Sequence, residues 1–361
     1  MLFKYQNIKA IIPGIILALI FCLFSQGINN LIAIEIFDTP KSPISTVLIA
    51  ILLGIIMGNA FTPRPGMMIG LDFTQQYILK LGIIFLGIRL SFSDLIKFGS
   101  IAIPLVIFCI LGVIILIKLL IRKVPISSKM SYLIAIGTSV CGATAIVATA
   151  PVINAKKTEV AYAIANITLF GVIAMLVYPY FAEWYFDNNS LEAGLFLGTA
   201  IHETSQVAAA GLIYDQQFNN PETLDVATVT KLIRNTALVI LIPLFAFLYN
   251  RGVVKDQKYS ILSIFPYFVI GFIGMIIVRN IGDQIFTTEN NNFYIWSKLI
   301  EYLKILTTVF LTMAMAAVGI SINLSELKSM GYKPFIVGLI AAVTVGIISL
   351  IYIETIKDLI I

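Results

Sequence analysis

The chain has 361 residues, of which 59% are hydrophobic and only 12% are charged. Soluble domains carry about a quarter of their residues as charged side chains, so this composition excludes an ordinary soluble protein. The formal net charge of +5 is modest and no basic run occurs, so we expect no nucleic-acid partner. The three cysteines lie inside apolar runs and predict no disulfide framework. We expect one integral membrane domain over residues 1–361.

About eleven apolar segments of spanning length follow one another along the chain. A helical crossing needs roughly 20 apolar residues. The segments begin near Ile8, Ile44, Ile78, Ile101, Tyr132, Val160, Leu191, Val226, Ile261, Leu299 and Phe335. The first resembles a secretory signal but lacks a cleavage site, so we expect it to remain as a signal anchor. The sequence predicts an all-α, polytopic membrane protein.

Two of these segments are unusually polar. Residues 132–153 are crowded with Gly, Ser, Thr and Ala, and residues 191–213 carry His202, Glu203 and Gln206 at their centre. Loop lysines and arginines are distributed more asymmetrically if both segments are re-entrant hairpins, and cytoplasmic loops normally hold the excess. Bent helices that cross the membrane would explain the same composition. Both alternatives predict two broken central segments.

Two internal similarities suggest repeats. The run from Gly87 to Leu95 resembles the run from Gly319 to Leu327, and an odd number of crossings between them makes the copies antiparallel. Inverted repeats of this kind build secondary transporters, although two Ser-acidic helix caps could also match by chance. A looser pair aligns the run Gly137–Thr144 with the run Gly198–Ser205. We expect both of these runs to be unwound.

The first polar segment has the composition of an anion site. Its two bracketing glycines are Gly137 and Gly142, and its polar side chains are Thr138, Ser139, Cys141 and Thr144. Irregular backbone is tolerated at membrane depth only where protein or a water-filled cavity satisfies it. A half-helix that begins there would direct amide N–H groups at an anion. Close packing of small residues is the alternative explanation.

The second polar segment holds the single histidine of the chain, His202, beside Glu203. A charged residue in a membrane segment costs roughly 2.5–3.5 kcal/mol on insertion scales, which indicates a use. We expect this pair to carry a coupling proton or to help bind sodium, unless the two side chains only satisfy each other at a packed junction. The run resembles the HExxH zinc motif, but Gln206 replaces the second histidine. We therefore expect no metal and no cofactor.

Two arginines lie in or near apolar segments. Guanidinium groups bind oxyanions in bidentate fashion, so Arg89 and Arg234 are candidate anion ligands. Arg89 lies close enough to a segment end to reach the headgroups instead. The sequence lacks a GxxxxGK[ST] phosphate loop, so a gradient would have to drive transport.

Four motifs together resemble the YeiH-type family of sulfate exporters over nearly the whole chain. They are the runs Gly137–Gly142 and His202–Val207, Lys231-x-x-Arg234, and Gly87-x-Arg89-Leu90. The resemblance implies a multi-pass protein of the bacterial inner membrane, with a fold related to sodium/proton antiporters and bile-acid symporters, inverted repeats and broken central helices. Ala143 and Glu203 stand where members of that family vary, and variation at these positions would tune the substrate or the coupling ion.

The expected function is secondary active transport, with no enzyme activity. The substrate would be a small anion such as sulfate, sulfite or a small organosulfonate, moved outward by alternating access. The expected substrate ligands are Thr138, Ser139, Cys141, Gly142, Thr144, Thr204, Ser205, Gln206, Arg234, Arg89 and Asn323, and the expected coupling residues are His202 and Glu203. The alternatives are a cation/proton antiporter, a non-transporting membrane sensor and, more remotely, an intramembrane enzyme. The expected partners are the anion, the lipid bilayer and a second copy of the chain.

Overall fold

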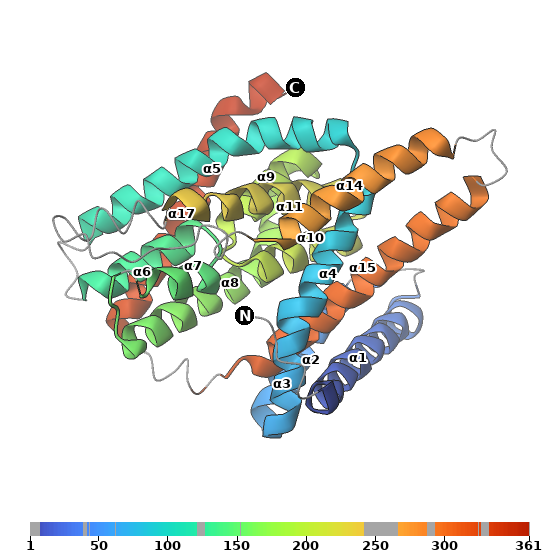
Figure 1. Cartoon of the computed structure of the whole chain (residues 1–361), viewed down its shortest axis with the longest axis horizontal. Helices are drawn as coiled ribbons and strands as arrows, with labels where there is room; N and C mark the ends of the chain where they lie inside the picture. The colour runs from blue at the N-terminus through green and yellow to red at the C-terminus, as the bar shows by residue number, and fades with distance from the viewer. Residues whose placement is uncertain are drawn as a thin grey trace. The chain divides into compact units, whose positions relative to one another are not determined.

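The computed structural model describes residues 8–360 apart from 39–41, 43, 62, 121–126, 152, 242–265, 287–292, 324 and 326–331. Every regular element in this described part is a helix (Figure 1), which confirms the expected all-α class. Seven helical runs there are apolar and long enough to cross a membrane, and α2 (Thr46–Ala60) is a shorter apolar helix.

The expectation of eleven spanning segments is therefore too high for the described chain. The reason lies mainly in three segments. Residues 132–153 and 191–213 are each broken into two short helices. The third, expected from Val226, begins inside α11 (Pro221–Thr236), which has only 16 residues, four of them charged, and it continues beyond the described residues. The segment expected from Ile261 begins outside the described residues and is followed by α14 (Phe268–Ile285).

Two compact units interleave along the chain. Unit 1 consists of residues 1–92, 212–221 and 268–325, and unit 2 consists of residues 93–211, 222–267 and 326–361. Each unit is described by itself below. A single integral membrane domain stays a prediction.

Unit 1 contains the first and the penultimate long helices of the described chain. Its elements are α1 (Ile8–Leu31) with η2 (Ile32–Ile36), α2, α3 (Pro65–Phe73), η3 (Thr74–Ile78), α4 (Leu79–Leu86), η4 (Gly87–Arg89), α14 and α15 (Phe293–Ser321). The helix α15 packs against α2 and α4, and α1 packs against α3. Large apolar side chains such as Ile20, Leu23 and Phe24 remain exposed on α1, as lipid contact requires.

A polar turn interrupts the second long helix of unit 1. Gln75 donates from Nε2 to the Ala317 carbonyl at 3.0 Å and to Ser321 Oγ at 2.7 Å. Because α15 satisfies this amide, the polar stretch remains helical as the π-helical turn η3. The helical run consequently begins at Pro65 and not near Ile78 as expected.

The first internal similarity has a structural counterpart in unit 1. The Leu90 amide donates to the Gly87 carbonyl, and the aligned Ile322 amide donates to the aligned Gly319 carbonyl, both at 3.2 Å. Both copies thus end a long helix with the same backbone turn.

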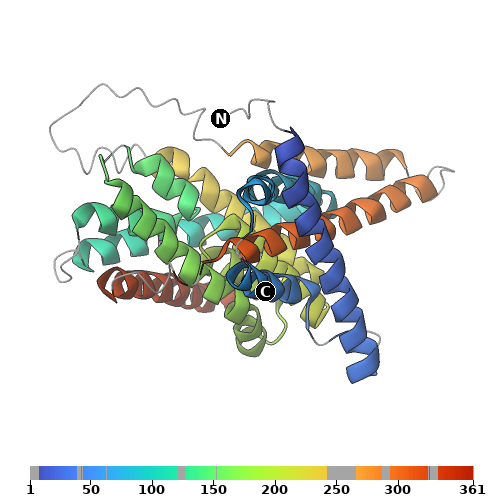
Figure 2. The ribbon, with the colours of Figure 1, turned by 90° about the horizontal axis from the view of Figure 1, so that it is seen from below.

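Unit 2 holds the two broken segments. Its elements are α5 (Phe92–Leu120), α6 (Ser128–Ser139), α7 (Ala143–Thr149), α8 (Lys157–Phe186), α9 (Ser190–Ala200), the first part of α10 (Thr204–Phe218), α11 and α17 (Tyr332–Ile360). The long helix α8 contacts α6, α7 and α9. Figure 2 shows α17 in dark red along one side of this unit, where it packs on α8 and α9.

Candidate functional site

The first broken segment is a hairpin. At its entrance, Ser127 Oγ donates to Glu159 Oε1, and Lys129 Nζ donates to the Asn154 carbonyl at 2.7 Å. Residues 154 and 159 follow α7, so the chain leaves this segment at the end where it entered. A Cβ on Gly137 would lie 2.8 Å from Ile146 Cδ1, which shows that α7 folds back against α6. The tip is formed by residues 140–142.

The second broken segment is also a hairpin. At its entrance, Ser190 Oγ donates to Glu222 Oε2 at 2.5 Å, and Thr223 Oγ1 donates to the Ser190 carbonyl at 3.4 Å. Residues 222 and 223 lie in the first turn of α11, the helix that follows α10, so the chain returns to the end where this segment entered. Its tip is formed by residues 201–203. The structure favours re-entrant hairpins over broken crossing helices in both segments.

The two hairpins enter from opposite ends of α8 and meet halfway along it. The first hairpin precedes the start of α8, and the second follows its end. Gly171, the fifteenth of the 30 residues of α8, contacts the Gln206 side chain at the start of α10. Near the other tip, Gly137 contacts Ile167 of α8. A 30-residue helix is about 45 Å long, so both tips lie far from either end of it.

Lys231 on α11 holds the two tips together. Its ammonium group donates to the carbonyls of Val140 and Ile201, both at 3.0 Å, and to the carbonyl of His202. The side chain is fully buried. All three of its N–H donors are therefore used by backbone that the breaks have freed.

Arg234, one turn further along α11, donates to backbone carbonyls at the ends of α6 and α9. Its Nε donates to the Ser139 carbonyl at 2.7 Å, its Nη1 to those of Thr199 and Ile201, and its Nη2 to that of Thr138. The carbonyl end of a helix carries partial negative charge, which a cation stabilises. The guanidinium is thus engaged by the backbone, and its expected contact with an anion stays a prediction.

These contacts match the second internal similarity. Thr138 aligns with Thr199, and both carbonyls bind Arg234. Val140 aligns with Ile201, and both carbonyls bind Lys231. The aligned runs are therefore equivalent in structure, and each leaves helical geometry only at its tip, residues 140–142 and 201–203.

The tips carry an excess of positive charge. Neither Lys231 nor Arg234 forms an ion pair with a carboxylate in the described part of the chain. The acidic residue at the tips is Glu203, whose Oε1 accepts from the Ala143 amide at 3.4 Å. A fully buried charge without a counter-ion is strongly unfavourable, so this junction favours an anion.

Several buried polar atoms around the two cations have no hydrogen-bond partner among the described residues. They are Thr138 Oγ1, both ring nitrogens of His202, Thr230 Oγ1 and Asn235 Oδ1. Each such group costs about 1–3 kcal/mol when it stays unpaired. These five atoms, here called the polar set, belong to the two broken segments and to α11. Thr230 and Asn235 were missed at the sequence level, although they directly flank Lys231 and Arg234.

Two expected ligands lie in unit 1 and are engaged locally. Arg89 pairs with Asp215 at 3.5 Å and donates to the Pro221 carbonyl at 3.0 Å. Asn323 Oδ1 accepts from the amide of Ser325 at 3.0 Å and from its hydroxyl at 2.6 Å. These local contacts engage both side chains, and their expected contact with substrate stays a prediction.

The remaining expected ligands lie at or beside the tips and differ in exposure and in hydrogen bonding. Thr144 is exposed on α7, and Thr204 and Ser205 are partly buried at the start of α10. The Ser139 hydroxyl donates to the Ala135 carbonyl at 2.6 Å, and Gln206 Oε1 accepts from the Glu203 amide at 3.2 Å. Gly142 has φ +67°, in the left-handed region that favours glycine.

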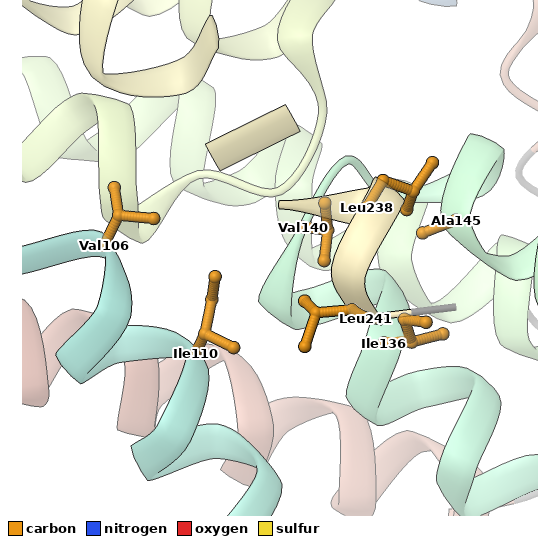
Figure 3. Close-up of a cluster of buried hydrophobic side chains, with 7 residues drawn as sticks. All are labelled: Val106, Ile110, Ile136, Val140, Ala145, Leu238 and Leu241. Atoms are coloured by element: carbon orange, nitrogen blue, oxygen red, sulfur yellow. The ribbon is translucent and has the colours of Figure 1, made fainter. Parts of the chain in front are cut away.

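An apolar cluster supports the first tip from α5. It contains Val106, Ile110, Ile136, Val140, Ala145, Leu238 and Leu241 (Figure 3). Cys141, the remaining expected ligand, is partly exposed and packs against this cluster. The cluster holds residues on both sides of the break in place.

A family model described as conserved hypothetical protein 698 matches residues 13–338. The chain belongs to this family. The match with the conserved hypothetical protein 698 family includes both hairpins and α11, and the chain is a multi-pass membrane protein.

Three relatives are called UPF0324 membrane proteins. The one from Streptococcus agalactiae is 33% identical over 352 residues, which cover 96% of each chain. The one from Fusobacterium nucleatum is 32% identical over 323 residues, or 88% of this chain and 91% of its own. The one from Clostridium tetani is 29% identical over 356 residues, or 95% and 96%. No solved structure matches. These names state no substrate.

Proposed function

We propose that the protein is a secondary active transporter of a small anion, which binds where the two hairpin tips meet. One observation carries the proposal: two fully buried cations, Lys231 and Arg234, lie between the tips without a carboxylate partner in the described chain.

The architecture around these cations supports transport. Secondary transporters hold their substrates near the bilayer midplane between discontinuous helices, where half-helix amino termini face anionic groups. Here the tips meet halfway along α8, and α10 begins at that point. Gradient-driven exchange is the remaining energy source, because the sequence contains no phosphate loop.

The polar atoms at the tips favour an oxyanion. Sulfate, sulfite and small sulfonates present several acceptor oxygens on one centre. The hydroxyls of Thr138 and Thr230 and the His202 ring can donate to such oxygens. The resemblance to sulfate exporters supports the same substrates and is the sole basis for an outward direction.

A cation/proton antiporter is less consistent with this site. Lys231 and Arg234 would repel a bound cation, and no cluster of three metal-binding side chains occurs among the described residues. A sensor would need the same binding site but would produce no flux.

The proposal predicts that an oxyanion raises the unfolding temperature of the purified protein, because a ligand that binds only the folded state stabilises it by about 2.7 kcal/mol at 100 times its Kd. The screen compares sulfate, sulfite and taurine with sodium chloride at equal ionic strength. Thr230→Val should unfold near the wild-type temperature and lose the shift, because it removes only the unpaired hydroxyl.

The matched control is Thr228→Val on the same helix. Thr228 Oγ1 donates to the Leu224 carbonyl at 2.8 Å and lies outside the polar set. This variant should keep the oxyanion shift. The absence of any oxyanion shift in folded wild-type protein would overturn the proposal, and equal shifts in both valine variants would remove Thr230 from the site.

A further inference from the structure

The two tips differ in charge at their last aligned position. Residues 140–142 align with residues 201–203, so Gly142 of the first tip corresponds to Glu203 of the second. Each of these residues immediately precedes a half-helix, α7 or α10. The first tip therefore has no side chain at the position where the second has a carboxylate.

The Glu203 side chain crosses to the other hairpin. A Cβ on Gly142 would overlap Glu203 Cγ, and Glu203 Oε1 accepts from the Ala143 amide at 3.4 Å. The carboxylate thus lies against the start of α7, between the tips. The absence of a side chain at Gly142 provides the space that it occupies.

The surroundings of Glu203 are positive. From α11, the charge of Lys231 acts on it, and Arg234 lies one turn further along. Cys141 is the titratable group of the facing tip, and His202 is its neighbour in the chain. When ionised, the carboxylate offsets part of the charge that would otherwise attract an external anion.

We propose, on the basis of the proposed function, that the Glu203 carboxylate and the transported anion compete for this one positive junction, so that the anion binds only after Glu203 has taken up a proton from the aqueous phase. Protonation removes the internal negative charge, and the substrate anion replaces it opposite Lys231 and Arg234. Anion and proton then travel together as a symport. An inward proton gradient would drive uptake, contrary to the outward direction that the sequence resemblance implies.

The test is calorimetric titration of the full-length protein in detergent with sulfate and with methanesulfonate. Both anions keep their charge between about pH 5.5 and about pH 8, so a change of affinity reports on the protein. Wild-type affinity should fall about tenfold per pH unit once Glu203 ionises, and titrations in two buffers of different ionisation enthalpy should show uptake of about one proton per anion. Glu203→Gln should bind each anion with the same affinity at about pH 5.5 and at about pH 8, and without proton uptake.

Glu192→Gln is the matched control, since Glu192 lies at the base of the same hairpin and accepts from Asn189. This variant should keep the wild-type pH dependence. A pH-independent wild type, or a Glu203→Gln protein that retains the pH dependence or the proton uptake, overturns the competition while leaving anion binding intact. Folded wild type and Glu203→Gln that bind neither anion at either pH overturn the proposed function and this inference with it.

Discussion

Lys231 and Arg234 resolve a problem that the breaks create. Each interrupted helix leaves carbonyl groups without an intrahelical donor, and a buried carbonyl left unpaired costs about 1–3 kcal/mol. The two side chains together donate to carbonyls at the ends of both α6 and α9. They are therefore structural residues that also set the potential at the tips.

Arg234→Lys should lower stability. A lysine keeps the charge but has three donors on one nitrogen and cannot span the carbonyls of both hairpins as the planar guanidinium does. We expect a loss of about 1–3 kcal/mol for each carbonyl left unpaired, measured as a lower unfolding temperature. Arg279→Lys is the control, because Arg279 forms a partly exposed pair with Asp283 one turn away. An Arg234→Lys protein of wild-type stability with weaker anion binding would show that the guanidinium contacts the anion.

The sequence indicated which residues matter at the tips more accurately than what they contact. The intramembrane charges Glu203 and Arg234 were recognisable because such charges are costly. The partners of Arg234 are main-chain carbonyls more than thirty residues away in sequence. Main-chain groups are present at every position, so side-chain identity could not reveal this pairing.

At the level of elements, α9 and α11 run parallel in close contact. A Cβ on Gly194 would lie 2.5 Å from Val226 Cβ, and one on Gly198 would lie 2.6 Å from Thr230 Cβ. Small residues one turn apart allow helix backbones to approach closely. This approach lets Lys231 and Arg234 reach the last carbonyls of α9.

Gly198→Ala should therefore destabilise the protein. Overpacking a close contact typically costs about 1–3 kcal/mol, and the helices would have to separate near Thr230. The measurement is the unfolding temperature, compared with that of Gly274→Ala. Gly274 lies in α14 with no atom near its Cβ position, so that variant should be as stable as wild type or gain about 0.5–1 kcal/mol. Equal stability of both variants would contradict the close packing of α9 on α11.

The sequence predicted helices correctly, but it predicted the residues at which they begin and end less well. The asymmetry of loop lysines favoured hairpins, and the structure agrees. One long helix begins at Pro65, earlier than the sequence predicted. The polar residue Gln75 lies within this helix because its side-chain amide donates to α15. The count of eleven was too high for the described chain, because the halves of the two broken segments and the helices α2 and α11 are all shorter than a spanning helix.

On the scale of the whole molecule, the two hairpin bases of unit 2 differ in charge. Lys129, Lys156 and Lys157 lie where α8 begins, while Asp187 and Glu222 lie near its end. Lysine-rich loops normally stay in the cytoplasm. We therefore expect the first hairpin to enter from the cytoplasm and the second from outside.

Cysteine labelling in intact cells tests this orientation. Lys157→Cys and Glu222→Cys, each in a chain whose three native cysteines are replaced by alanine, place one exposed thiol at each base. A membrane-impermeant maleimide should label the cysteine at 222 in whole cells and the one at 157 only after permeabilisation. Labelling of both from outside would contradict hairpins that enter from opposite sides.

The repeats were visible in sequence because each copy retains its glycines and small polar residues. The interleaving of two units was not, since it depends on contacts between segments such as residues 1–92 and 268–325. Tertiary pairing of this kind leaves no periodic signal in the chain.

Counterflow in proteoliposomes tests the central claim most directly, because it requires binding and alternating access but no knowledge of the coupling ion. Liposomes that contain the full-length protein and unlabelled sulfate are diluted into a trace of radiolabelled sulfate. The account predicts transient accumulation of label, absent from protein-free liposomes, reduced in Thr230→Val and preserved in Thr228→Val. Folded, reconstituted protein that accumulates no label with sulfate, sulfite or taurine inside would contradict it.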